Sequence, residues 1–264
     1  MENKIKVGFV GLSHLGLNYL AAASKKGLSV SGIDADVSRI NRLNKFLIDH
    51  DEPNLKKTIF RNKKNIFFFN NFNSLKECQV IFISEDVDTN NKGKGDFKKL
   101  SKLIKRTLKF VSKKSVLVIL SQVYPGFVRK INFDKSRLYY HVETLIFGKA
   151  LERALNPERI IVGSEKPKTK ISKPYLNFLK KFKCPIINMK YESAELTKIS
   201  INIFLASSIT ATNMLAQVCE KISADWEDVM PALRLDQRIG KKAYIKPGLG
   251  IGGGNIERDI YSIG

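Results

Sequence analysis

Two glycine-bearing stretches hold the residues of this sequence that are best placed to do chemistry. Near the N-terminus, "VGFVGLSHLG" puts Gly11, Ser13 and Gly16 at the three positions of a G-x-G-x-x-G fingerprint. Gly11 permits a tight turn, Gly16 permits close helix–strand packing, and Ser13 holds the position where the backbone approaches a pyrophosphate. Serine is small, and its hydroxyl could donate to a phosphate oxygen. We expect this loop, with His14 and Leu15, to bind a dinucleotide at the positive end of the next helix.

An acidic residue stands at the distance from this loop that dinucleotide binding requires. Asp34, in "SGIDAD", ends the second expected strand about 20 residues after the fingerprint. A carboxylate there can accept hydrogen bonds from both ribose hydroxyls and would repel the 2′-phosphate of NADP. The combination therefore predicts NAD as the cofactor. The alternative is an ordinary tight strand–helix turn followed by a solvated aspartate.

The second stretch, "KPGLGIGGGNIERD", covers residues 246–259 near the end of the sequence. Its density of glycine lets the backbone approach a ligand closely. Polar and charged residues follow the glycines, with Asn255 at the centre of the stretch. The pattern indicates a ligand-binding loop.

Alternating strands and helices must position the first loop. Apolar strand-like runs cover residues 4–12, 28–34, 65–69, 79–84, 115–121, 137–143 and 159–163, and helical patterns cover 14–27, 38–49 and 96–113. This alternation predicts an α/β fold of the Rossmann type, with a doubly wound parallel sheet.

The pattern changes near residue 190. Residues 192–225 contain neither Gly nor Pro and predict one long helix that is apolar on much of its circumference. Such a helix is usually buried on several sides, often between domains or subunits, and a shorter helix is expected within 225–236. We therefore expect an NAD-binding domain at residues 1–188 and a helical domain at 189–264.

Composition narrows the class of protein. The net charge of +21 comes from 46 basic and 25 acidic residues. Basic residues are spread along the chain, so solvated surface lysines are favoured over an anionic small molecule or a nucleic acid as their explanation. No stretch of about 18 consecutive apolar residues predicts a membrane span, and no signal peptide is evident. Three scattered cysteines without metal or redox spacing favour a cytoplasmic protein without a metal site.

Several stretches in one order resemble the UDP-glucose/GDP-mannose dehydrogenase family. They are "VGFVGLSHLGL", "GID", "SQVYPGFVRK", "NPERIIVG", "SAELTKISINIFLA", "DQRIG" and "PGLGIGGGNIERD". The resemblance covers nearly the whole chain and implies a Rossmann domain followed by a central helix that builds a homodimer, here at residues 191–222. It also implies that Ser121 and Gln122 lie at the cofactor.

The resemblance assigns catalytic roles to four residues. Lys198 and Asn202 match a K-x-x-x-N motif, and a spacing of four puts both on one helix face. Asp259 matches the active-site aspartate after the glycine loop, and Glu143 matches the first glutamate of a "P-E-F-L-R-E" segment. Oxidation of an alcohol needs a proton acceptor and a hydride acceptor. Lys198 and Asp259 could hold the hydroxyl or a water between them.

The resemblance also implies a nucleotide-sugar substrate. Backbone N–H groups of the second glycine loop would wrap the sugar or its phosphates. The candidate substrate-binding residues are Gly250, Gly252, Gly253, Arg238 and Arg258. Each arginine could equally be an ordinary surface residue.

Departures from the family pattern fall on its second oxidation step. Asn255 stands where the family has its nucleophilic cysteine, and an amide is not a comparable nucleophile. Phe147 replaces a second glutamate, Gln122 replaces a threonine, and Arg258 replaces a lysine. The sequence stops at Gly264, so we expect the family's C-terminal nucleotide-binding domain to be missing. Either the sequence is a fragment of a longer protein, or the substrate is held in a different way.

These observations predict an NAD-dependent oxidation of a UDP- or GDP-sugar, reduced to a single hydride transfer by the loss of the cysteine. One alternative is a β-hydroxyacid-type dehydrogenase, against which the second glycine loop argues. The other is an NAD-binding scaffold or sensor without activity, which the lost cysteine favours and the retained Lys198, Asn202 and Asp259 disfavour.

Overall fold

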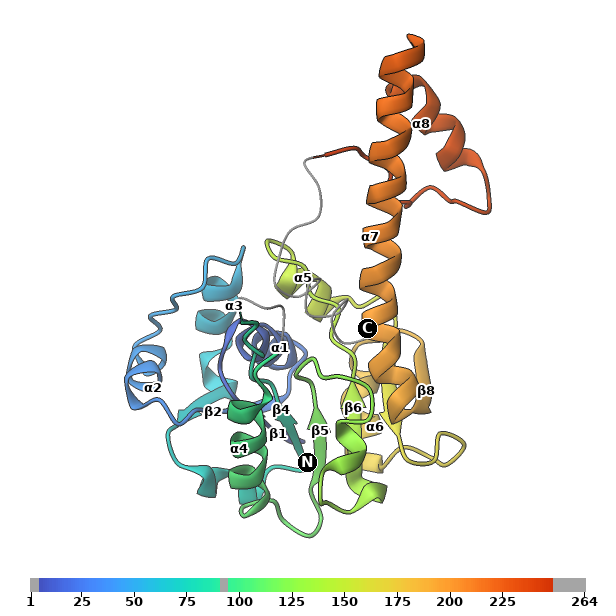
Figure 1. The fold of residues 1–264 in the computed structure, drawn as a ribbon. Helices are drawn as coiled ribbons and strands as arrows, with labels where there is room; N and C mark the ends of the chain where they lie inside the picture. Colours follow the sequence, from blue (N-terminus) through green and yellow to red (C-terminus); the bar gives the residue numbers. More distant parts are fainter. Residues whose placement is uncertain (1–4, 91–94, 249–264) are drawn as a thin grey trace. The chain divides into compact units, whose positions relative to one another are not determined.

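The computed structural model describes residues 5–90 and 95–248 of the chain (Figure 1). The described residues form two compact units. The first ends at Lys198, and the second begins at Ile199 and also takes in the short segment that starts at Thr89. This division falls within the long helix, further along the chain than the boundary at 188/189 suggested by the sequence.

Helices and strands alternate through the first unit. The strands are β1 (Lys6–Val10), β2 (Ser29–Ile33), β3 (Ile66–Phe69), β4 (Val80–Ile83), β5 (Val116–Ile119), β6 (Leu138–His141), β7 (Ile160–Ser164) and β8 (Ile186–Lys190). The α-helices are α1 (His14–Lys25), α2 (Val37–Asn44), α3 (Leu55–Arg61), α4 (Phe97–Leu108), α5 (Ala150–Leu155), α6 (Lys173–Lys180), α7 (Tyr191–Ile222) and α8 (Trp226–Leu235). Four short 3₁₀ turns are η1 (Lys63–Asn65), η2 (Phe72–Glu77), η3 (Val128–Lys130) and η4 (Lys135–Arg137).

The sheet has the order β3-β2-β1-β4-β5-β6-β7-β8. The direction in which strands are added reverses between β1 and β4, which creates a crevice at the carboxyl ends of these two strands. The predicted Rossmann-type architecture is confirmed, with one difference. β7 pairs with β6 in antiparallel orientation, whereas every other strand pair in the sheet is parallel. The apolar pattern could not reveal this orientation, because buried parallel and antiparallel strands are both apolar.

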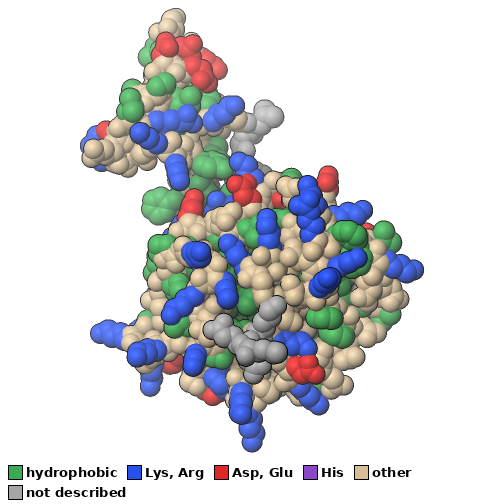
Figure 2. Space-filling model, turned by 180° about the vertical axis from the view of Figure 1, so that it is seen from behind, with side chains coloured by type: hydrophobic (Ala, Val, Ile, Leu, Met, Phe, Trp, Pro, Cys, Tyr) green, Lys and Arg blue, Asp and Glu red, His purple; other side chains and the backbone are tan. Residues whose placement is uncertain are grey.

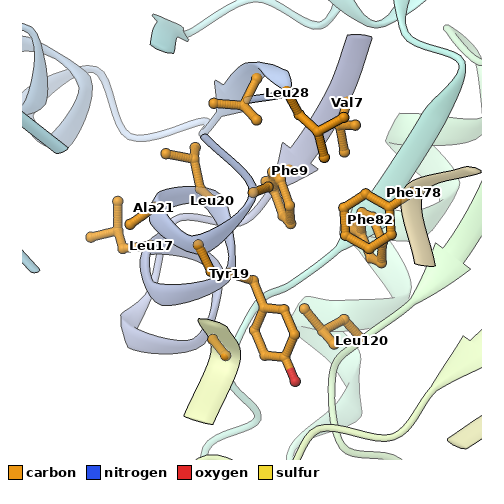
Figure 3. Close-up of a cluster of buried hydrophobic side chains, with 14 of the residues drawn as sticks. Val7, Phe9, Leu17, Tyr19, Leu20, Ala21, Leu28, Phe82, Leu120 and Phe178 are labelled. Atoms are coloured by element: carbon orange, nitrogen blue, oxygen red, sulfur yellow. The ribbon is translucent and has the colours of Figure 1, made fainter. Parts of the chain in front are cut away.

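Apolar side chains cover both faces of the sheet. Successive residues of a strand point to opposite faces, so Val80 and Phe82 of β4 join one core cluster while Ile81 and Ile83 join the other. The first cluster packs against α1, α3 and α6, and in it the rings of Phe9 and Phe82 stack with centroids 5.0 Å apart (Figure 3). The second packs against α4 and the first turn of α7. Helices on both faces explain why these strands are continuously apolar.

The second unit is built on α7 and α8. Trp226 and Cys219 pack together with Ile245, and the Trp226 indole N–H donates to the Ile245 carbonyl at 3.1 Å. By length and composition α7 could cross a membrane, and 17% of its most apolar window is buried. The expectation of no membrane span rested on strictly consecutive apolar residues, which this helix lacks. A single such helix is weak support for a membrane, because a soluble protein's core helix passes the same test.

Lysine and arginine side chains are scattered over the face shown in Figure 2 and do not gather into one basic stripe. An electrostatic footprint for nucleic acid is usually a clustered patch. The basic residues on that face therefore do not form such a patch.

A buried histidine at the end of β6 couples stability to pH. His141 Nδ1 lies 2.9 Å from the Tyr175 hydroxyl, with the Tyr19 and Phe82 rings edge-on to the imidazole. Burial lowers the pKa of His141 from 6.5 to about 3. Between these two values the unfolded chain binds one more proton than the folded chain, so this group's contribution to stability is complete above pH 6.5 and is lost as the pH falls.

We expect His141→Gln to weaken the acid sensitivity of folding. The glutamine keeps a polar partner for Tyr175 and does not titrate, so the free energy of unfolding should fall less steeply below pH 6.5 than in the unmodified protein. The difference in slope should approach about 1.4 kcal/mol per pH unit. Urea unfolding of both proteins at several pH values measures it. Equal slopes for the unmodified and His141→Gln proteins would contradict the assignment.

Candidate functional site

The turn between β1 and α1 has the geometry of a dinucleotide loop. Gly11 has a φ of +91°, and a Cβ on it would lie within 2.8 Å of Glu85. A Cβ on Gly16 would collide with the Gly11 carbonyl oxygen, and it would lie 2.9 Å from Ser84 Oγ. Only glycine fits at either position, which is the role the sequence predicted for both.

Asp34 lies at the carboxyl end of β2 and holds this turn in place. Its Oδ2 accepts a hydrogen bond from the Leu12 N–H at 3.0 Å and forms an ion pair with Arg39 Nη1 at 2.7 Å. Its Oδ1 accepts from the Asp36 N–H at 2.9 Å. The carboxylate is therefore at the place expected for ribose recognition, and Arg39 lies beside it. The turn and this carboxylate fit the adenosine side of a dinucleotide.

Residues of the loop after β4 form hydrogen bonds with groups that we expected to bind a phosphate. The Ser13 hydroxyl donates to the Ser84 carbonyl at 3.2 Å and accepts from the Asp86 N–H at 3.0 Å. The Leu15 N–H, in the first turn of α1, donates to Asp86 Oδ2 at 3.3 Å. The Ser13 hydroxyl thus has two partners within the chain, and its contact with a phosphate stays a prediction.

His14 uses its ring on a neighbouring loop. Its Nε2 lies 3.0 Å from Glu52 Oε2, and its ring stacks on Phe147 with centroids 4.7 Å apart. The Glu52 carboxylate is buried and also accepts from the N–H groups of Gly148 and Ala150 at 3.1 and 2.7 Å. Glu52 thereby ties the dinucleotide loop to the segment after β6. Phe147 itself is 77% exposed.

Ser121 and Gln122 are buried just beyond β5. The Ser121 hydroxyl donates to the Glu85 carbonyl at 2.6 Å, so it shapes the loop after β4. The Glu85 carboxylate is buried and pairs with Lys99; burial raises its pKa and the lysine opposes that rise. Ser121 therefore lies beside the loop after β4 and holds its backbone, and Gln122, the next residue, is buried.

Glu143 and Lys198 come together as a buried ion pair. Lys198 Nζ lies 2.7 Å from Glu143 Oε1, and the two side chains are 9% and 11% exposed. Glu143 Oε2 accepts from the Leu145 N–H at 2.9 Å. Glu143 follows β6 at the carboxyl edge of the sheet, and Lys198 lies two turns into α7. These two residues, far apart in sequence, lie together, and the catalytic role that the resemblance implies for each stays a prediction.

Glu195 fixes the start of α7 beside this pair. It is completely buried, and its carboxylate accepts from the N–H groups of Gly126 and Val128 at 2.6 and 2.8 Å. Burial raises the pKa of Glu195, while the two N–H donors lower it. Because Lys198 lies one turn further along the helix, Glu195 sets the position from which the lysine side chain extends.

The other expected site residues fall outside this cluster or outside the described residues. Asn202 lies one turn beyond Lys198 on α7. Arg238 pairs with Asp236 at 2.7 Å, and its side chain is 90% exposed. The positions of Asn255, Asp259, Gly250, Gly252, Gly253 and Arg258 lie outside the described residues.

Four acidic residues of the site were not assigned from the sequence: Glu52, Glu85, Asp86 and Glu195. Glu85 and Asp86 carried a usable signal, since two acids directly follow a buried strand. Glu52 and Glu195 carried none, because their backbone partners are 67 to 98 residues away along the chain. Within residues 5–90 and 95–248 no cluster of three or more His, Cys, Asp or Glu side chains could hold a metal ion.

Comparison with known proteins identifies the family. The NAD binding domain of the UDP-glucose/GDP-mannose dehydrogenase family matches residues 5–181, and the central domain of that family matches residues 192–264. A putative UDP-glucose 6-dehydrogenase of Bacillus subtilis, YtcA, is 28% identical over 98% of this chain and 62% of its own length. The chain thus spans about three fifths of that relative.

Solved structures show the same fold. A UDP-glucose dehydrogenase of the archaeon Pyrobaculum islandicum superposes with a TM-score of 0.85 at 23% identity, over 99% of this chain and 63% of that chain. A GDP-mannose dehydrogenase of Pseudomonas aeruginosa gives 0.79 at 19% identity, over 97% of this chain and 63% of that chain. The two consecutive domain matches, the glycine turn and the buried Glu143–Lys198 pair all agree with the same family. The chain belongs to the UDP-glucose/GDP-mannose dehydrogenase family.

Proposed function

We propose that this chain supplies the NAD-binding and central domains of a nucleotide-sugar dehydrogenase that removes one hydride from its substrate. The observation on which this rests most is the buried Glu143–Lys198 pair, at 2.7 Å, beside a dinucleotide fold. The relatives act on different sugars by their names, UDP-glucose and GDP-mannose among them, so the substrate class is a UDP- or GDP-linked sugar.

The residues of this chain can manage the charges of an alcohol oxidation. The alcohol loses a proton from oxygen and a hydride from carbon and becomes a carbonyl group. NAD, when bound, supplies the hydride acceptor. Glu143 holds the Lys198 ammonium group at 2.7 Å, and this group would stabilise negative charge that develops on the substrate oxygen. Asn202 would orient that oxygen, and Asp259 would accept the proton.

Two replacements support a single oxidation. Asn255 replaces the cysteine that the family uses to attack the intermediate aldehyde, and an amide does not form that bond. Phe147 replaces a glutamate, and it puts an exposed aromatic ring where a water-activating carboxylate would lie. The atoms needed for the first hydride transfer are retained, whereas those needed for a covalent second transfer are altered.

The first test is the stoichiometry of NADH formation. We expect the full-length protein to form one NADH per sugar from a member of a panel of UDP- and GDP-sugars, with a carbonyl product by mass spectrometry. Asn255→Cys should raise the yield toward two NADH and a carboxylate. Two NADH from the unmodified protein would rule out the single oxidation. NAD binding without turnover across the panel would favour an NAD-binding scaffold.

The second test removes the buried pair. Lys198→Met should lower kcat by about 10²–10³, the loss typical of one transition-state donor, with NAD affinity unchanged. Glu143→Gln should also lower kcat, because the lysine loses its carboxylate partner. Each single change leaves one buried charge unpaired and should cost about 3–5 kcal/mol of folding stability.

The double variant Glu143→Gln/Lys198→Met separates these effects. It should be more stable than the sum of the single changes predicts, by about 1–3 kcal/mol in urea unfolding. Lys6→Met is the matched control, since Lys6 pairs with Glu77 at the opposite end of β1. It should leave kcat within about twofold, as expected for a surface pair. Additive effects of the two changes on stability would show that the residues are not coupled. An active Lys198→Met protein would show that catalysis does not need the pair.

A homodimer through α7 is part of the same proposal. Exposed apolar side chains on α7 form a stripe along one face of the helix: Phe204, Met214, Leu215, Val218 and Ile222, with exposures between 48% and 76%. An exposed apolar stripe of this kind marks an interaction surface. Lys198 and Asn202 lie on the other side of the helix, so a second copy could cover the stripe without covering them.

We expect Phe204→Lys to make the protein monomeric, because a charged side chain would enter the centre of a dry interface. Glu220→Lys introduces the same residue on the opposite side of α7 and should leave the dimer intact. Sedimentation velocity over a range of concentrations measures both. A monomeric unmodified protein, or equal effects of the two substitutions, would contradict the dimer.

A further inference from the structure

The loop after β4 is fastened to the dinucleotide loop by three hydrogen bonds. The Ser13 hydroxyl makes two of them, one to the Ser84 carbonyl and one from the Asp86 N–H. The third runs from the Leu15 N–H to Asp86 Oδ2 at 3.3 Å. We call the segment Ser84–Asp86 the latch. The latch thus engages the Ser13 hydroxyl and the Leu15 N–H group. Both belong to the turn that binds the cofactor in the family fold.

The Asp86 carboxylate lies where an anion is most stabilised. The first N–H groups of a helix have no partner within the helix, and the helix dipole gives this end a partial positive charge. Ser13, the N-cap residue of α1, makes no capping bond with its side chain. The Asp86 carboxylate therefore takes the electrostatic position that a phosphate takes at such helix ends.

Asp86 differs from its acidic neighbours because no lysine or arginine of the described residues pairs with it. Asp34 pairs with Arg39 at 2.7 Å, and Glu85 pairs with Lys99. Among the described residues, no lysine or arginine forms an ion pair with Asp86. A pyrophosphate that approached Leu15 would meet an uncompensated carboxylate already bonded to that N–H group.

We propose that Asp86 limits the affinity of this chain for NAD by occupying the α1 N-terminus in place of a phosphate. Binding of the dinucleotide then requires Asp86 to release the Leu15 N–H, and it places two anions near each other. Loss of the carboxylate tightens cofactor binding. The proposal rests on the cofactor site alone, so it is independent of which sugar is oxidised and of how many oxidations occur.

Three changes at this position separate charge from contact. Asp86→Asn removes the charge and keeps an oxygen that can accept from the Leu15 N–H. Asp86→Ala removes both, and Asp86→Glu keeps the charge. Asp88→Asn is the matched control, because it removes one exposed carboxylate from the same loop, two residues away, without touching the dinucleotide turn. Thermal unfolding of each variant confirms that its fold is intact.

The experiment is calorimetric titration with NAD, ADP-ribose and adenosine at low and at high salt. Asp86→Asn and Asp86→Ala should bind NAD and ADP-ribose more tightly by on the order of five- to tenfold at low salt. ADP-ribose has the pyrophosphate without the cationic nicotinamide, so its gain assigns the effect to the phosphates. Adenosine, Asp86→Glu and Asp88→Asn should stay within about twofold, and salt should shrink the gain because exposed charges are screened.

Two kinds of result would overturn the proposal. If Asp86→Asn and Asp86→Ala bind NAD no better than the unmodified protein, or neither binds it at all, the carboxylate does not compete with the cofactor. If adenosine or Asp88→Asn shows the same gain, the cause is not repulsion at the α1 N-terminus. Binding by Asp86→Asn where the unmodified protein shows none would be the strongest support. None of these outcomes depends on turnover, so a failure of the proposed oxidation leaves the test intact.

Discussion

The buried ion pair between Glu143 and Lys198 is the constraint on which the arrangement of the first unit depends. A lysine ammonium with a 9% exposed side chain is stable only beside a carboxylate, because unpaired burial of a charge is far costlier than burial of a pair. The pair therefore ties the first two turns of α7 to the end of β6. Glu195 adds a second tie to the same turns through the Gly126 and Val128 N–H groups. Together they make the start of α7 part of the sheet unit and fix the lysine at its edge.

The same device recurs around the site. Asp34, Glu52, Glu143 and Glu195 are buried, and each accepts hydrogen bonds from backbone N–H groups of a loop. Loops that enclose a site leave N–H groups without helix or strand partners, and buried N–H groups must be satisfied. Carboxylates meet this need with several acceptor positions each. This explains how a chain with 46 basic and 25 acidic residues has an acidic site edge, since many of its lysines and arginines lie at the surface.

Features that depend on local sequence could be predicted, whereas contacts between residues far apart along the chain could not. Gly11 and Gly16 follow from backbone sterics, and the buried strands follow from apolar runs bounded by turn residues. The family motifs brought Lys198 and Glu143 to one site. The antiparallel β7, the partners of Glu52 and the second partner of Ser13 depend on which loops meet in three dimensions. Single polar residues in loops have no periodicity, so their partners leave no mark on the sequence.

Two side chains act on the electrostatics of the carboxyl edge in opposite directions. At position 147 an aromatic ring stacks on His14, whose other contact is the Glu52 carboxylate, so this part of the edge becomes apolar where the family has an acid. At Asp86 an acid lies against the α1 N-terminus, so the cofactor turn becomes more negative. Under the proposed single oxidation, Phe147 offers no carboxylate to activate a water, which reinforces the loss of the nucleophile at position 255. A looser hold on the dinucleotide would speed cofactor exchange, so Asp86 bears on the affinity for NAD and not on the number of oxidations.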